Sequence, residues 1–190
     1  MDNINIAFAL TGSFCTFSEV ITQMKKLSEL KANIIPIMSE NAYSTDTRFG
    51  KAETFREQIE SICKKQIIHT IEGAEPLGPK KMADILLVAP CTGNTLAKLA
   101  GSITDTPVTM AVKSHIRNSR PVVICIATND ALAGSAKNIG ALLNNRNYYF
   151  VPFRQDDYRE KPTSLVAEFE LIPQTLERAL HKEQLQPLIV

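Results

Sequence analysis

The chain has 190 residues, of which 44% are hydrophobic and 22% are charged, and its formal net charge is +1. This composition is that of an ordinary soluble globular protein, and the length fits one domain over residues 1–190. The near-neutral charge argues against a strongly electrostatic nucleic-acid binder, and the longest apolar stretches, Ile85–Ala89 and Val122–Ala127, are too short to cross a membrane.

The first half of the chain alternates apolar runs with stretches of helical periodicity, which predicts two strands that are each followed by a helix. In chain order these are the strand Ile4–Leu10, a helix with apolar residues from Val20 to Leu30, the strand Asn33–Met38 and the helix Lys51–Lys64. Thr11-Gly12-Ser13 ends the first strand, and Ser39–Arg48 reads as a polar loop.

The second half repeats this unit. Asp84–Ala89 is an almost unbroken apolar run, which is typical of a strand that is buried on both faces, and Pro90–Gly93 ends it. The elements expected after it are the helices Asn94–Ala100 and Thr106–Asn118, the strand Pro121–Ala127, the helix Asp130–Asn145, the strand Tyr148–Val151 and the helix Pro173–Leu185.

This alternation predicts an α/β protein of Rossmann-like, doubly wound type, with three layers and a parallel sheet between helices. Ligands bind such sheets beyond the carboxyl ends of the strands. Four predicted strand ends carry small or polar residues, namely Thr11-Gly12-Ser13, Ser39, Cys91-Thr92-Gly93-Asn94-Thr95 and Thr128-Asn129. We therefore expect one ligand site at this edge.

Two serine sites have the chemistry of phosphate ligands. Thr11-Gly12-Ser13 stands where backbone N–H groups, a helix dipole and a hydroxyl all favour an anion. Ser39 follows the second strand and can donate to a phosphate. A helix cap at Ser13 and a turn serine at Ser39 are the alternatives. The glycine pattern is not that of a dinucleotide site, because the second and third glycines are missing.

The loop after the third strand is the most informative segment. Gly93 would let the backbone approach a flat ligand, and Asn94 and Thr95 could read the edge of a heterocycle. Lys98 lies one turn further on. The alternative is an ordinary helix capped by Thr92 or Asn94.

The run PCTGNTLAKLAGSITD, Pro90–Asp105, resembles the signature of the flavoprotein family that includes the flavin prenyltransferases and the homo-oligomeric flavin-containing cysteine decarboxylases. The resemblance covers most of residues 4–150 and implies FMN as the cofactor. It implies that Ser13 and Ser39 hold the phosphate and that the Pro90–Thr95 loop meets the ribityl chain and the ring. It also implies that Arg120 lies near the flavin or a bound anion, with a surface position as the alternative.

The enzymes of this family have residues that this chain lacks. Pro76 stands where the decarboxylases have a histidine, and no cysteine follows Cys125. The decarboxylase interpretation thus loses its base and its proton donor. Tyr158, before Pro162, is one residue away from the spacing of the prenyltransferase tyrosine that grips an alkyl phosphate.

A narrower group within the family, the B subunits of dipicolinate synthases, fits better. The resemblance rests on the segments Leu77–Asp84, Cys91–Thr95, Ala127–Leu132, Asn138–Gly140 and Leu185–Ile189. This resemblance implies an FMN-binding subunit that oxidises dihydrodipicolinate to dipicolinate during sporulation. It implies a nicotinamide-binding A subunit as the partner and the mother-cell cytoplasm as the location. The family resemblance implies a homo-oligomer, a trimer or a multiple of one.

A dicarboxylate substrate requires cations, because carboxylates pair well with arginine and lysine. The candidates are Lys98, Lys113, Arg117, Arg120, Arg154 and Arg159, with Tyr158 as a further anion contact. No catalytic residue is assigned. Two alternatives stay open: a flavin-binding or assembly subunit without catalysis, and a prenyltransferase-like or decarboxylase-like enzyme.

The four cysteines have no CxxC spacing and the three histidines are scattered, so we expect neither a disulfide nor a metal site. We interpret Cys91 as a small residue beside the flavin and not as a nucleophile, since no histidine is placed to serve it. Met1–Asn5 has no basic segment or apolar core of a secretion signal, so we expect a cytoplasmic protein.

Overall fold

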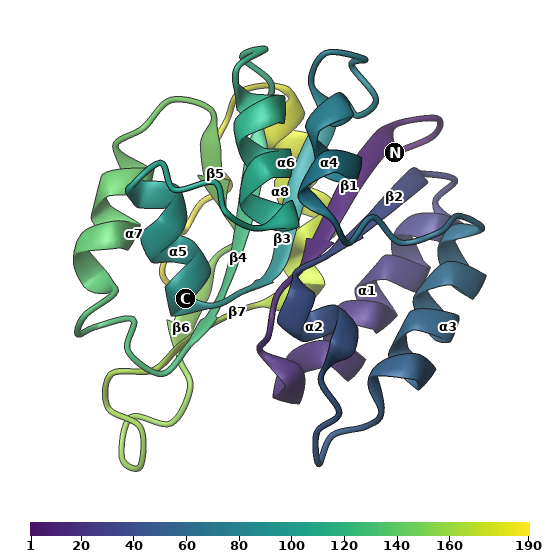
Figure 1. The fold of residues 1–190 in the computed structure, drawn as a ribbon. Coiled ribbons are helices and arrows are strands. Elements are labelled where there is room, and N and C mark those ends of the chain that lie inside the picture. Colours follow the sequence, from purple (N-terminus) through teal and green to yellow (C-terminus); the bar gives the residue numbers. More distant parts are fainter.

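The computed structural model describes all 190 residues, and a seven-stranded sheet runs through its centre (Figure 1). The strands are β1 (Asn5–Leu10), β2 (Asn33–Met38), β3 (Ile85–Cys91), β4 (Val122–Thr128), β5 (Tyr148–Phe150), β6 (Phe153–Gln155) and β7 (Leu165–Ala167). Their order is β2-β1-β3-β4-β7-β6, and β5 also pairs with β4. This arrangement confirms the predicted α/β class.

The first five strands are parallel. β1 lies between β2 and β3, with Ile6 opposite both Ile34 and Ile85. β3 pairs with β4, and every residue of β3 is buried. This explains why β3 is an uninterrupted apolar run, since helices cover both of its faces.

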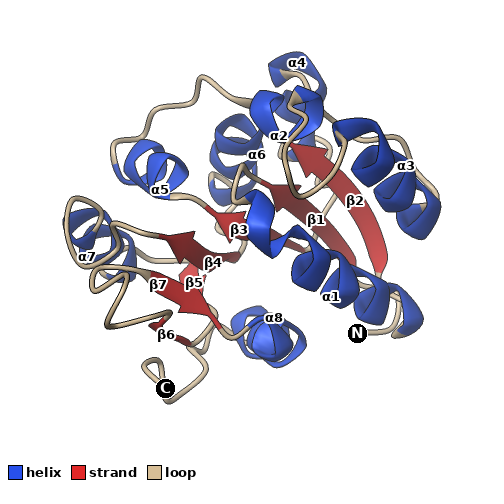
Figure 2. Cartoon of the chain, turned by 90° about the horizontal axis from the view of Figure 1, so that it is seen from below, coloured by secondary structure: helices blue, strands red, loops and turns tan.

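Helices cover both faces of the sheet, with α1 and α8 on one side and α5, α6 and α7 on the other (Figure 2). The helices are α1 (Phe17–Glu29), α2 (Glu40–Ser44), α3 (Ala52–Cys63), α4 (Ile71–Ala74), α5 (Gly93–Ala100), α6 (Pro107–Ile116), α7 (Ala136–Leu143) and α8 (Ile172–Leu180). Short 3₁₀ turns lie at η1 (Phe14–Thr16), η2 (Glu75–Leu77) and η3 (Phe169–Leu171). No helix is both long enough and apolar enough to cross a membrane.

The predicted parallel sheet is extended at one edge by two antiparallel strands that the sequence did not predict. β7 pairs antiparallel with β4, through Ala127 opposite Val166, and β6 pairs antiparallel with β7. These strands have three residues each, too few for an alternating pattern to stand out. Together with the loop between them they form the β6–β7 hairpin (residues 153–167), which extends the sheet beside the carboxyl end of β4.

Further boundaries differ from the prediction, among them the end of α8, which lies at Leu180 and not at Leu185. α2 lies inside the segment predicted as a loop, where the Ser39 side chain caps it. α7 begins at Ala136 and not at Asp130, because residues 130–135 form a turn in which the Ser135 N–H donates to the Asp130 carbonyl at 3.1 Å. The Ser135 hydroxyl also bonds the Asp130 carboxylate.

Candidate functional site

A cavity of about 480 Å³ lies beyond the carboxyl ends of β1, β3 and β4, and we call it the edge cavity. Its lining comes from Gly12–Thr16, Arg48, Phe49, Thr92, Ala127–Asn129, Asp156, Lys161 and Ser164–Val166. Among the residues predicted from the sequence, the structure brings together Gly12, Ser13, Thr92, Thr128 and Asn129 in this lining. Parallel strands that end at the same edge explain this convergence.

Thr11 ties β1 to the loop after β3. Its buried hydroxyl donates to the Pro90 carbonyl at 2.7 Å and accepts the Thr92 N–H at 3.1 Å. The Thr92 hydroxyl in turn accepts the Thr95 N–H at 3.3 Å and caps α5. Thr11, Thr92 and Thr95 therefore use their hydroxyls in hydrogen bonds within the protein, and Thr92 is the helix cap that the alternative interpretation of this loop names.

Ser13 differs from these threonines because its hydroxyl has no nitrogen or oxygen partner. Its Oγ lies 3.9 Å from Cys15 Sγ and does not cap η1. Its backbone N–H donates to the Thr11 carbonyl at 2.8 Å, which holds the turn in shape. Ser13 thus presents a free hydroxyl at the wall of the edge cavity.

Ser39 caps α2, a role that the sequence did not predict for it, since the alternative considered there was a turn serine. Its Oγ accepts the Ala42 N–H at 3.3 Å, and its own N–H donates to the Leu10 carbonyl at 3.0 Å. The second of these bonds joins the carboxyl ends of β2 and β1, and the first caps α2. Ser39 does not line the edge cavity, so the structure does not bring the two predicted serine sites into one lining.

The absence of a side chain at Gly93 is explained by packing within the protein. A Cβ at this position would lie 2.6 Å from Asp130 Oδ1, 2.7 Å from Ser135 Oγ and 2.8 Å from Thr128 Oγ1. Thr128 and Ser135 both hydrogen-bond Asp130. This polar cluster lies against Gly93, so packing within the protein is sufficient to explain the glycine, and the approach of a flat ligand to its backbone stays a prediction.

The other residues of this loop lie at different depths. Cys91 is fully buried, and burial raises the pKa of its thiol above the ordinary value. It therefore packs in the core and does not lie at the cavity surface beside a ligand. Pro90 is also buried, whereas Asn94 is exposed on the first turn of α5.

Arg120 lies at the opposite edge of the sheet, just before β4 begins. Its guanidinium donates to the Ala83 carbonyl and lies 3.8 Å from Asp84 Oδ1, at the amino end of β3. Within one chain Arg120 therefore lies away from Ser13 and the edge cavity, and its predicted place near the flavin or a bound anion stays a prediction. Its position is explained by the need to join the amino ends of β3 and β4.

The three residues predicted to contact substrate do not line the edge cavity. Lys98 pairs with Asp105 at 2.8 Å, and this hydrogen bond lowers the pKa of the Asp105 carboxyl. Arg154 pairs with Glu168. Tyr158 is 63% exposed on the loop of the β6–β7 hairpin.

Sequence reasoning missed two groups of lining residues. Arg48 and Phe49 come from the loop between α2 and α3, where the Arg48 guanidinium lies 4.9 Å from the centre of the Phe49 ring. Arg48 forms no ion pair, and Phe49 is 46% exposed. The sequence feature that could have indicated this group is Phe49, an aromatic residue in an otherwise polar loop. The second group, which includes the Asp156–Lys161 pair at 2.9 Å, comes from the hairpin that was not predicted.

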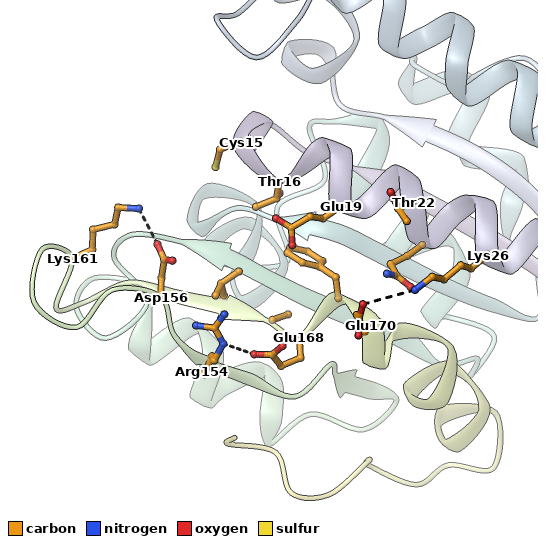
Figure 3. A pocket seen from close by; sticks show the side chains of 14 residues that line it. Cys15, Thr16, Glu19, Thr22, Lys26, Arg154, Asp156, Lys161, Glu168 and Glu170 are labelled. Carbon is orange, nitrogen blue, oxygen red and sulfur yellow. Dashed lines mark hydrogen bonds and ion pairs between the residues drawn. The ribbon is translucent and has the colours of Figure 1, made fainter.

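A second cavity, of about 570 Å³, lies between α1 and the β6–β7 hairpin, and we call it the side cavity (Figure 3). It shares Cys15, Thr16, Asp156, Lys161 and Val166 with the edge cavity, so the two are neighbours. Ion pairs occupy most of its charged lining, namely Lys26–Glu170, Arg154–Glu168 and Lys161–Asp156.

Comparisons with known proteins agree with one another. Residues 1–165 match the model of the Flavoprotein family. The B subunit of the dipicolinate synthase of Bacillus subtilis is 46% identical over 185 residues, which covers 97% of this chain and 92% of that protein.

Two solved structures extend the comparison. The crystal structure of the dipicolinate synthase B subunit from Bacillus halodurans has a TM-score of 0.92 at 42% identity, covering 100% of this chain and 97% of that one. DmrB of Burkholderia xenovorans, solved in complex with FMN, has a TM-score of 0.69 at 18% identity, covering 94% of this chain and 96% of that one. At this identity the likeness to DmrB is one of fold.

Proposed function

Because the chain belongs to the Flavoprotein family and is a homologue of the dipicolinate synthase B subunit, we propose that it binds FMN at the edge cavity as the flavin-binding component of a dipicolinate synthase. The observation that carries this proposal is the pair of uncommitted donors in the cavity wall. The Ser13 hydroxyl has no nitrogen or oxygen partner, and the Arg48 guanidinium has no ion-pair partner.

These residues fit FMN in charge and in size. A phosphate requires hydroxyl, guanidinium or backbone N–H donors, and Ser13 and Arg48 offer the first two. A cavity of about 480 Å³ is within the range of about 300–1,000 Å³ that is usual for small-molecule and cofactor sites. Phe14 and Phe49 add aromatic surface to the lining, which suits a planar ring system.

The chemistry of the site divides between cofactor and protein. FMN, when bound, supplies a two-electron acceptor. The chain itself binds and orients an anion through Ser13 and Arg48, and Leu165 and Val166 form apolar wall. No histidine lines the cavity, and its one carboxylate, Asp156, is paired with Lys161. The site therefore supports a reaction that needs orientation and charge more than acid–base catalysis, as the aromatisation of a dihydropyridine does.

We propose dihydrodipicolinate as the substrate and dipicolinate as the product. The named relatives are components of a dipicolinate synthase, which supports a nicotinamide-binding A subunit as partner and a role in the mother-cell cytoplasm during sporulation. FMN-binding relatives of the same fold support assembly into a homo-oligomer. An oxidoreductase role for this chain follows from these proposals.

A subunit that binds flavin without catalysis is the second candidate, and the lack of a histidine or an unpaired carboxylate in the edge cavity favours it. An anaerobic mixture of the FMN-loaded chain, the A subunit and dihydrodipicolinate separates the two. Loss of flavin absorbance in step with dipicolinate formation supports the oxidoreductase. Dipicolinate that forms only after an oxidised nicotinamide cofactor is added, with unchanged flavin absorbance and an equal yield of reduced nicotinamide, supports the assembly role, because the nicotinamide then takes the two electrons. Turnover of an alkyl phosphate or of a peptide with a carboxy-terminal cysteine by the chain alone would contradict both.

A further inference from the structure

A third cavity, of about 230 Å³, lies between α5 and α6 beside the first residue of β5, and we call it the helix cavity (Figure 1). It shares no lining residue with the edge cavity or the side cavity. Leu99 on α5 and Val112 and Ile116 on α6 form apolar walls. Its volume is below the range of about 300–1,000 Å³ that is usual for drug-sized ligands, so it fits a smaller molecule with an apolar body.

Tyr148 gives this apolar cavity a hydrogen-bond donor without a partner. Burial raises the pKa of the Tyr148 phenol to about 12, so the hydroxyl keeps its proton at neutral pH. The hydroxyl forms no hydrogen bond within the protein, yet it is not sealed in the core, because Gln23 Oε1 and His115 Nδ1 are the only buried side-chain nitrogen or oxygen atoms without a partner. The hydroxyl of a partly buried tyrosine normally has a partner, so this one is available to an acceptor on a ligand.

The charged lining of the helix cavity is a single cation. Lys113 lies on α6, is exposed and forms no ion pair, and no carboxylate lines the cavity. Asp105, which follows the lining residue Thr104, accepts two hydrogen bonds from Lys98 at 2.8 and 2.9 Å. Thr104 and Ser102 add hydroxyls that form no hydrogen bond within the protein. An anion in this cavity therefore meets a cation and hydroxyl donors without breaking an ion pair, whereas a cation would face the uncompensated Lys113.

We propose that the helix cavity binds a small carboxylate with an apolar body, which pairs with Lys113 and accepts a hydrogen bond from Tyr148. An ionised carboxylate has two acceptor oxygens, so it can meet the ammonium and the hydroxyl at once. Leu99, Val112 and Ile116 then contact the apolar body and remove its surface from water. This inference does not depend on the proposed flavin site, because the two cavities have no lining residue in common.

A titration of the full chain with benzoate, followed in amide NMR spectra, tests the proposal. Benzamide has the same ring without the charge, and acetate has the charge without the ring. We expect benzoate to bind at least about tenfold more tightly than either, because hydrogen bonds to charged groups are the stronger ones and because the ring buries apolar surface. The amide signals that shift should belong to residues 102–104 and 112–116 and not to residues 12–16 of the edge cavity.

Matched variants locate the site. Lys113→Met removes the cation from an exposed position, and we expect it to weaken benzoate binding by about tenfold. Tyr148→Phe removes only the hydroxyl and keeps the ring that packs against the core, and it should weaken binding by about fivefold. Lys137→Met, which removes the same charge from an exposed position on α7, leaves binding unchanged.

Four results overturn the proposal. They are the absence of benzoate binding, equal binding of benzamide or acetate, shifts confined to residues 12–16, and full affinity for benzoate in Lys113→Met or in Tyr148→Phe.

Discussion

Single side chains decide which polar groups at the carboxyl edge are available to a ligand. Thr11 and Thr92 lie 81 positions apart in the sequence, yet the Thr11 hydroxyl accepts the Thr92 N–H and also bonds the Pro90 carbonyl. Ser13, two residues after Thr11, has no such partner and keeps a free hydroxyl. Sequence reasoning could name all three as candidates, but the contact that separates them is a tertiary one.

The close packing around Gly93 is tested by Gly93→Ala, which adds one carbon atom. A Cβ in Gly93→Ala would lie 2.6 Å from Asp130 Oδ1, so neighbouring atoms must move. We expect urea unfolding to show a loss of about 1–3 kcal/mol in the free energy of unfolding. Gly140→Ala, in α7 with nothing within 4 Å, is the control and should gain about 0.5–1 kcal/mol. A stable Gly93→Ala protein would contradict the packing that we describe.

His115 makes stability depend on pH. It is buried in α6 with an unpartnered Nδ1, and burial lowers its pKa from 6.5 to about 4. Between these values the unfolded chain binds the proton and the folded chain does not. The contribution of His115 is therefore complete above about pH 6.5 and is lost as the pH falls towards 4, by about 3 kcal/mol in total.

Unfolding measured from pH 7 to pH 4 checks this contribution. We expect His115→Gln to show a shallower decline of stability than the parent protein, because the group that titrates has been removed. His181→Gln, outside the buried core, should keep the parent slope. Identical slopes for the parent and His115→Gln would show that His115 is not the source.

At the scale of elements, different contacts stabilise the two edges of the sheet. Thr92 caps α5 at the carboxyl edge, while Arg120 joins the amino ends of β3 and β4. Local periodicity is sufficient to predict where α5 and β4 begin, so Thr92 and Arg120 both lie at predicted boundaries. Their roles depend on which edge of the sheet each boundary reaches.

The cap on α5 is tested by a pair of variants at Thr92. Thr92→Ala removes the acceptor of the Thr95 N–H and should lower the free energy of unfolding by about 1 kcal/mol. Thr92→Ser keeps a hydroxyl and should remain close to the parent protein in the same urea experiment. Equal losses in the two variants would point to packing of the threonine methyl group instead.

Two arginine variants test the assignment of the sheet edges. We expect Arg48→Met to weaken FMN binding by about tenfold with unchanged stability, because its exposed guanidinium contacts no protein carboxylate. Arg120→Met should lower stability by about 1–2 kcal/mol with unchanged FMN affinity, because it loses a hydrogen bond to the Ala83 carbonyl. The reverse pattern would place the flavin at the amino edge.

At the scale of the whole molecule, the sequence was sufficient for the α/β class, the parallel strands and the edge at which the cavity lies. Buried strands such as β3 leave an apolar pattern that survives without tertiary information. The β6–β7 hairpin leaves no such pattern, because its strands are short and partly exposed. The Asp156–Lys161 pair and the side cavity, which depend on this hairpin, were therefore not predicted. Ser39 and Ser13 are predicted to bind one phosphate, but the Ser39 hydroxyl accepts the Ala42 N–H as the cap of the short helix α2.

The central claim is that FMN binds at the edge cavity, and a titration of FMN fluorescence with the purified chain tests it most directly. The parent chain and Ser61→Asp, a control on the exposed surface of α3, should bind FMN with equal affinity. Ser13→Asp should bind at least about tenfold more weakly, because a carboxylate in place of the free hydroxyl repels the phosphate. A parent chain that leaves FMN fluorescence unchanged, or a Ser13→Asp chain that binds FMN as the parent does, would contradict the claim.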